Sequence, residues 1–149
     1  MLAIDQDMEL VEAVAELRAA ESPEAWRSGR PRDEEGGWSG WVGLGVREVL
    51  GERFWARLAV ERGEVARVEL RAVLEGDEEG LGGGWGRTPE VELERKRLHE
   101  AWVERVCGGR MSPVRDGPER PEAARWLVRP WGEVGSVLEE GEAVLRFRA

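Results

Sequence analysis

Regular alternation of apolar and polar residues between Phe54 and Leu74 constrains the fold of this chain more than any other feature of its sequence. The alternation has the two-residue period of a half-buried strand, and it is interrupted once, at Glu61-Arg62-Gly63-Glu64, by residues typical of a turn. It therefore predicts a β-hairpin with one apolar face. Such a face must be buried against another layer of secondary structure. Its members are Phe54, Ala56, Leu58, Val60, Ala66, Val68, Leu70, Ala72 and Leu74.

The C-terminal part of the chain also contains short apolar and alternating segments separated by turn residues. Short apolar runs at 126–128 and 134–138 precede a turn at 139–142, and residues 143–147 again alternate. These patterns predict three further strands. The pattern of residues 38–50 is compatible with either an irregular strand or a short helix that ends at Gly51.

Two segments have the spacing of amphipathic helices. In residues 7–20, Leu10, Val14 and Leu17 form one apolar stripe, and Asp7 is the expected cap. The helix should end at Ser22-Pro23.

The second helix should begin at Thr88-Pro89, because Thr caps helices and Pro fits their first position. Gly108-Gly109 should end it, and residues 110–124 are expected to form a long loop. The expected buried stripe is Val91, Leu98, Trp102 and Val106.

The order helix, β-meander, helix, β-meander predicts an α+β fold. We expect an antiparallel sheet of about five to six strands with two main helices on one face. A chain of 149 residues can form this as one domain over residues 1–149.

The net charge of the chain limits the classes of partner that it is expected to bind. Against 31 acidic residues the chain has 22 basic ones, a net charge of −9, and no basic stripe. Nucleic acid and anionic membranes are therefore not expected partners. The acidic N-terminus does not resemble a secretory signal, no apolar run could span a membrane, and Cys107 has no second cysteine to pair with, so we expect a cytoplasmic protein.

The usual parts of an active site are missing from the sequence. His99, the single histidine, is expected to be a half-buried packing or capping residue, since Glu100 faces another direction on the helix. The acidic pairs Glu34-Glu35, Glu78-Glu79 and Glu139-Glu140 fall in turns, and the glycines of 80–86 lack the ending of a phosphate-binding loop. We therefore expect no enzyme, no metal and no cofactor.

Eight tryptophans are the most unusual positive feature. Those at 55, 102, 126 and 131 lie in or beside predicted elements and are expected in the core. Trp38, Trp41 and Trp85 lie in glycine-rich segments near acidic loops, where either a core or an interface role is open.

The helix over Glu92–Gly109, the segment Trp131–Ser136 and the last strand, Ala143–Phe147, resemble small bacterial α+β immunity proteins of polymorphic toxin systems. This resemblance covers about a third of the chain. It implies a non-catalytic protein that occludes the active site of a toxin in the producing cell.

An acidic inhibitor would suit a basic toxin domain, because opposite charges speed association. Charge reversal at Glu34 and Glu35 should then weaken binding. A secretion chaperone acting as a homodimer is the alternative, distinguished from a monomeric inhibitor by its mass, and a small enzyme is a third class. The expected partner-binding surface combines acidic residues with two aromatic anchors, namely Asp33, Glu34, Glu35, Asp77, Glu78 and Glu79 with Trp38 and Trp85.

Overall fold

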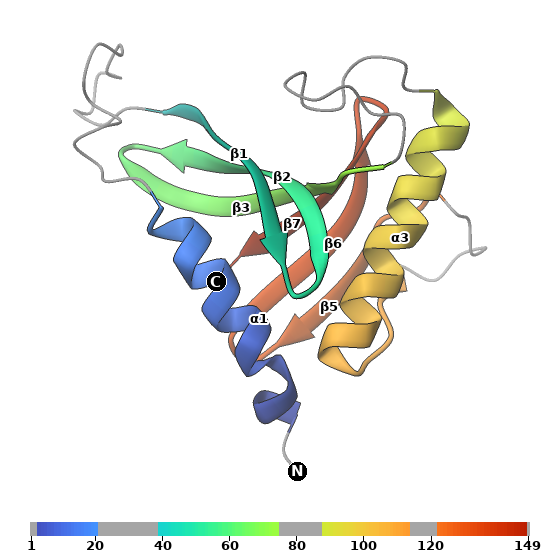
Figure 1. Cartoon of the computed structure of the whole chain (residues 1–149), viewed down its shortest axis with the longest axis horizontal. Coiled ribbons are helices and arrows are strands. Elements are labelled where there is room, and N and C mark those ends of the chain that lie inside the picture. Colours follow the sequence, from blue (N-terminus) through green and yellow to red (C-terminus); the bar gives the residue numbers. More distant parts are fainter. Residues whose placement is uncertain (1–2, 21–38, 75–87, 114–121, 149) are drawn as a thin grey trace.

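The computed structural model describes residues 3–20, 39–74, 88–113 and 122–148, which form two helices and one antiparallel sheet (Figure 1). The sheet order is β1-β2-β3-β7-β6-β5-β4. Along the chain the elements are α1 (Ala3–Arg18), β1 (Gly40–Val49), β2 (Glu52–Glu61), β3 (Glu64–Ala72), α3 (Pro89–Cys107), β4 (Ser112–Pro113), β5 (Arg125–Arg129), β6 (Gly132–Glu139) and β7 (Glu142–Arg148).

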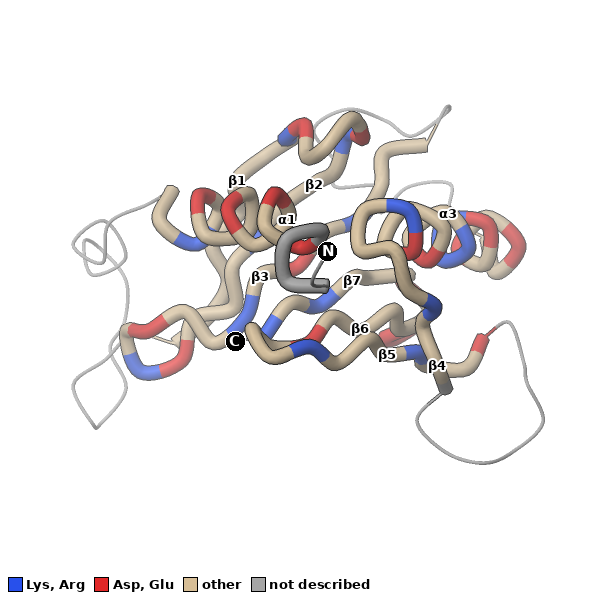
Figure 2. Tube along the Cα trace, turned by 90° about the horizontal axis from the view of Figure 1, so that it is seen from below, with Lys and Arg blue, Asp and Glu red and all other residues tan. Residues whose placement is uncertain are grey.

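The predicted α+β class is confirmed. Each helix is followed by a three-stranded meander, β1-β2-β3 or β5-β6-β7, and the two meanders join where β3 pairs with β7. Six of the described strands have five residues or more, and β4 adds two residues at one edge. Both helices lie over the same face of the bent sheet (Figure 2).

The hairpin predicted from the alternation is confirmed as β2 and β3. Its turn residues have positive φ, 52° at Arg62 and 78° at Gly63, and the turn between β6 and β7 has the same form, with 51° at Glu140 and 80° at Gly141. Two consecutive residues at positive φ match the twist of the flanking strands, which explains why both turns use a Gly second.

The open segment 38–50 is a strand over its described part. β1 pairs with β2 along its whole length, and the register shifts between Gly43 and Gly45. This β-bulge accounts for the irregular pattern of glycine and valine in the sequence.

Helix α1 begins earlier than expected, at Ala3, so the prediction that Asp7 caps it is wrong. Asp7 instead lies within the helix and is buried. Its Oδ2 accepts a hydrogen bond of 2.7 Å from Trp131 Nε1 and lies 3.2 Å from Arg129 Nε. A carboxylate that the sequence assigns to a helix end thus attaches α1 to the turn between β5 and β6.

The ends of α3 follow the prediction. Thr88 accepts a hydrogen bond from the Val91 N–H through its side chain, Pro89 starts the helix, and Gly108 ends it at a φ of 67°. The predicted apolar stripe is wrong except for Trp102, because Val91, Leu98 and Val106 are only partly buried. The buried face is rotated around the helix axis and comprises Glu92, Arg95, Lys96, His99, Trp102, Val103 and Cys107.

The core lies between the helices and the sheet. Phe54 from β2 packs edge-on against Trp102, with ring centroids 4.8 Å apart. Trp55, Trp126 and Trp131, also expected in the core, are partly buried. Within the expected loop 110–124, Ser112 and Pro113 pair with β5, and Pro113 is tolerated there because β4 is an edge strand.

Candidate functional site

The eight residues proposed above as a partner-binding surface, Asp33, Glu34, Glu35, Trp38, Asp77, Glu78, Glu79 and Trp85, lie outside the described residues. Their role stays a prediction. Trp41, which was not among these eight but shares the open core-or-interface interpretation with Trp38 and Trp85, is described, and it lies on the sheet face opposite the helices. We call this face the outer face, with Trp41, Arg57, Arg67, Glu69 and Arg146 at its centre.

Trp41 is the most exposed aromatic side chain among the described residues, at 47%. Its ring lies beneath two guanidinium groups, with Arg57 Cζ 4.1 Å and Arg67 Cζ 5.3 Å from the ring centroid. The register explains the contact, because the small Ala59 separates Trp41 from Arg67 in the same cross-strand row. Stacking of this kind restrains an exposed ring before any partner arrives.

A buried carboxylate fixes the two arginines in turn. Glu69 in β3 is 1% exposed although no described helix covers this face. Its oxygens lie 2.8 Å from Arg57, 2.6 Å from Arg67 and 3.3 Å from Arg146. Three cations around one buried carboxylate form a network that holds the guanidinium groups in place more firmly than isolated surface pairs would.

Apolar side chains lie at both edges of the outer face. Val128 in β5 is 71% exposed and Val46 in β1 is 39% exposed. Between them, the Trp126 ring lies over Gly135, where a Cβ would be only 2.2 Å from the ring. Aromatic residues and arginine with flanking apolar contacts are the composition typical of protein interfaces.

A second exposed surface is the solvent side of α1. Glu9, Glu12 and Glu16 are all exposed, and their spacing of three and four places them on one helix face. Figure 2 shows acidic positions recurring along α1. Met8, which is 52% exposed, adjoins this acidic stripe of Glu9, Glu12 and Glu16.

The charged, buried side of α3 has a structural task at the junction of the two meanders. Pairing between β3 and β7 ends at Leu70 and Leu145. The same register, continued by two residues, would pair Ala72 with Ala143. Their backbone groups are bound by side chains instead, which fill the opening between the two strands.

Each of the four backbone groups has its own partner. The Ala72 N–H donates to His99 Nε2 at 2.8 Å, and Arg95 donates to the Ala72 carbonyl. The Ala143 N–H donates to Glu92 Oε1 at 2.9 Å, and Arg71 donates to the Ala143 carbonyl at 3.1 Å. Buried backbone groups must be hydrogen-bonded, and this arrangement meets that requirement where the sheet cannot.

Burial and neighbouring charges at this junction shift the pKa values of His99 and Glu92. Burial, together with the charges of Arg95, Arg71 and Lys96, lowers the pKa of His99 well below its ordinary value, so the ring is neutral. Burial raises the pKa of Glu92, but the hydrogen bonds from Ala143 and Arg71 and the nearby positive charges outweigh it and leave a lowered pKa. Both groups therefore hold the charge state that the backbone contacts require.

Cys107 is the last residue of α3, and its free thiol is buried. Burial and the neighbouring carboxylate of Asp7 raise the pKa of Cys107 to about 12, with Arg129 acting in the opposite direction. An activated thiol has a lowered pKa, so this environment is that of a packing residue.

Within the described ranges, no group of three or more His, Cys, Asp or Glu side chains is placed to hold a metal ion. No described helix is long and apolar enough to cross a membrane. Comparisons of the chain with protein-family models, curated proteins and solved structures found no match.

The acidic stripe and the stacking of Trp41 were not predicted, although the sequence contains part of the signal for each. The acidic stripe is visible as acidic residues three and four apart in a predicted helix. The alternation of Arg67, Glu69 and Arg71 shows which residues share the polar side of β3, but it does not show that Trp41 lies across from Arg67. That requires the strand register.

Proposed function

We propose that this chain is a non-catalytic protein-binding domain that neutralises a partner protein by covering the partner's functional surface, in the manner of an immunity protein. The observation that carries the proposal is the exposed ring of Trp41. Arg57 and Arg67 stack on this ring, and both arginines are paired with the buried carboxylate of Glu69. A large rigid aromatic that is already ordered loses little entropy on binding, and tryptophan and arginine dominate interface hot spots.

The charge of the chain supports a basic partner. Its net charge is −9, and the acidic stripe on α1 places three negatively charged side chains in one exposed row. A negative field attracts a basic surface and raises the rate of association. A basic toxin domain acting in the cytoplasm, where the inhibitor would also reside, fits this polarity.

The buried titratable groups give further support. His99 and Glu92 are occupied with backbone groups, and Cys107 has a raised pKa. These side chains thus act in folding, which leaves the surface to account for the function.

The test is co-expression of the chain with the product of a neighbouring gene whose expression stops bacterial growth. Wild-type chain should restore growth and bind that product. Trp41→Ala should weaken binding by about 2 kcal/mol, roughly thirtyfold in Kd, as expected for a hot spot. Arg105→Ala, exposed on α3 and outside the outer face, is the control with retained affinity. Equal affinities for wild type and Trp41→Ala would refute the assignment of Trp41.

The polarity of the partner is tested separately through association rates. Charge reversal of Glu9, Glu12 and Glu16 to Lys should slow association and reduce its dependence on salt. Reversal of Glu90 and Glu94, exposed on α3, is the control. An association rate unchanged by reversal of the acidic stripe would contradict steering from α1.

One observation favours a secretion chaperone as the second candidate. An open apolar pocket of about 360 Å³ lies between α1 and the end of β7. Such a chaperone would be a homodimer that holds an extended segment of its cargo. The mass in solution separates the two functions, since a monomer of 16.7 kDa fits the inhibitor and an obligate dimer fits the chaperone. The pocket is lined by Val11, Val14, Ala15, Arg18, Ala19, Trp131, Phe147 and Arg148.

A further inference from the structure

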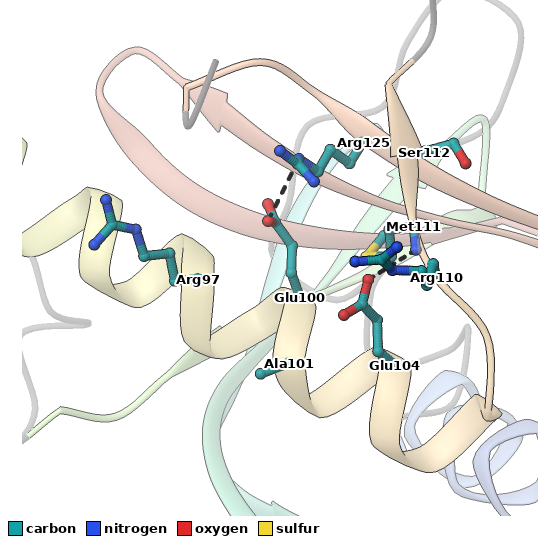
Figure 3. Close-up of a pocket in the computed structure, with 8 residues that line it drawn as sticks. All are labelled: Arg97, Glu100, Ala101, Glu104, Arg110, Met111, Ser112 and Arg125. Atoms are coloured by element: carbon teal, nitrogen blue, oxygen red, sulfur yellow. Dashed lines mark hydrogen bonds and ion pairs between the residues drawn. The ribbon is translucent and has the colours of Figure 1, made fainter. Parts of the chain in front are cut away.

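The two edges of the sheet differ in how they are protected. At one edge, β4 has only two residues, and one of them is Pro113, which cannot donate a hydrogen bond to a further strand. Side chains of α3 also hold this edge (Figure 3). Glu104 Oε2 accepts a hydrogen bond of 3.0 Å from the Met111 N–H, just before β4. Glu100 Oε1 lies 3.6 Å from Arg125 Nε in β5. This edge therefore offers little free backbone to another chain.

Strand β1 forms the opposite edge and is built differently. It has ten residues and pairs with β2 on one side, whereas the described residues supply no strand on its other side. Residues 40–46 carry no charge, and β1 contains no proline. Sheet edges are usually protected by charged residues, proline or short length, and of the common devices β1 has only its bulge. A long strand of this kind leaves backbone N–H and C=O groups to which another strand can bind.

The bulge determines which side chains of β1 share a face. Because of the register shift that follows Gly43, Gly43 lies opposite Arg57 and Val46 lies opposite Trp55. Trp41, Gly43 and Val46 therefore all belong to the outer face, and all three are exposed. We call these three residues the edge site.

The centre of the edge site is open. A Cβ added at Gly43 would meet no atom within 4 Å. Trp41 and Val46 lie on either side of this position along the strand, and Arg57 Cζ restrains the Trp41 ring at 4.1 Å from its centroid. Side chains directly opposite on paired strands have Cβ atoms about 4.5–5.5 Å apart. A glycine between two exposed apolar side chains thus leaves room for a large side chain from a neighbouring strand.

We propose that β1 binds an extended segment of a partner protein as an additional strand, with a large apolar side chain of that segment over Gly43, between Trp41 and Val46. In this mode of recognition, backbone hydrogen bonds supply affinity and the place for a side chain supplies selectivity. The inference rests on the proposed function and deepens it, since Trp41 belongs to both. A second copy of the chain is less suited to this edge, because two chains of net charge −9 repel each other and the bulge interrupts regular pairing of β1 with itself.

The test uses the full chain to select from a phage-displayed library of random linear peptides. We expect the selected peptides to alternate between apolar and polar residues, with an aromatic residue or leucine at one fixed position. A selected peptide should protect amides of β1 from hydrogen exchange. N-methylation of the peptide residues whose N–H groups face β1 should abolish binding, whereas N-methylation of the alternate residues should not.

Variants of the chain locate the bound peptide. Gly43→Val should weaken its binding by about tenfold or more, because the new side chain fills the space over Gly43. Gly43 does not have positive φ and a Cβ has room there, so the melting temperature should not fall. Val46→Thr and Val128→Thr make the same change at two exposed valines of the outer face. The first should weaken binding by about fivefold, and the second, in β5 near the opposite edge, should leave it unchanged.

The possible failures separate this inference from the proposed function. The added strand would be overturned by a library that yields no peptide bound at β1, by equal affinity of wild type and Gly43→Val, or by equal losses for Val46→Thr and Val128→Thr. A dimer in sedimentation that Gly43→Val dissociates would assign the edge to a second copy instead. If the neutralised partner bound Gly43→Val as tightly as wild type but Trp41→Ala more weakly, the proposed function would stand and the added strand would be refuted.

Discussion

His99 accepts a hydrogen bond from the Ala72 N–H through Nε2 at 2.8 Å, and this single contact shows how α3 completes the end of β3. An imidazole can accept at Nε2 only while that nitrogen has no proton. Arg95 binds the carbonyl of the same residue, so the two helix side chains occupy both hydrogen-bonding groups of Ala72. The junction of the two meanders therefore depends on a neutral histidine.

The first prediction concerns pH. Since the folded pKa of His99 is lowered, the unfolded chain binds a proton that the folded chain does not. Stability from this residue is complete above about pH 6.5 and is lost as the pH falls below it, by up to about 1.4 kcal/mol per pH unit. Urea unfolding from pH 7.5 to 5.5 measures the slope.

A matched variant isolates this effect, because His99 is the only histidine. His99→Gln offers an uncharged acceptor in place of the ring and should show a nearly flat profile over the same range, even if it is less stable overall. The same slope in wild type and His99→Gln would contradict the assignment to His99.

The second prediction concerns Glu92. Glu92 Oε1 lies 2.8 Å from Arg71, and Glu92 Oε2 lies 3.2 Å from Arg95, a fully buried residue. Glu92→Gln would leave two buried guanidinium groups without their carboxylate, which costs about 3–5 kcal/mol. Denaturant unfolding measures the loss, and Glu94→Gln, exposed on the same helix, should stay within about 0.5 kcal/mol of wild type. Similar stabilities for the two variants would rule out this role of the pair.

The ends of α3 and the turn between β2 and β3 could be predicted from the sequence, because their signals are local. Thr88, Pro89 and Gly108 act within one turn of helix, and Arg62-Gly63 forms its turn from its own backbone geometry. The alternation in β2 and β3 is likewise a property of neighbouring residues. Short-range physics thus accounts for the fold class.

The buried side of α3 could not be predicted in this way. An apolar pattern points to Val91 and Leu98, while the side that is buried holds Glu92 and His99. These residues are buried because β3 and β7 separate after Leu70, and no local pattern contains the place where two distant strands part. For the candidate site, the sequence marked Trp41 as one of three possible interface tryptophans, but its stacking on Arg57 depends on the register of β1 with β2.

The third prediction concerns the close approach of Gly135 and Trp126. A Cβ at position 135 would lie 2.2 Å from Trp126 Cζ3, so Gly135→Ala must displace the ring. We expect a loss of about 1–3 kcal/mol on urea unfolding. Gly43→Ala, where a Cβ meets nothing within 4 Å, is the control with little change. In a Trp126→Ala background the cost of Gly135→Ala should largely disappear, and persistence of that cost would show that the ring is not its cause.

The last prediction concerns the reactivity of Cys107. With its pKa raised to about 12, the thiolate fraction at pH 8 is on the order of one in ten thousand, and the thiol is buried. Modification by a disulfide reagent should therefore require opening of the structure, and its rate should rise in parallel with the unfolded population as urea is added.

Asp7→Asn provides the variant that separates charge from burial, since Asp7 raises the Cys107 pKa and also pairs with Arg129. After correction for its lower stability, Asp7→Asn should react at the wild-type rate, because the reacting thiol belongs to the opened state, where Asp7 no longer raises its pKa. A faster corrected rate for Asp7→Asn would mean that the native thiol reacts directly and that the charge of Asp7 helps to protect it. Rapid modification of native wild type at pH 8 would show that Cys107 is accessible and would contradict the packing role assigned to it.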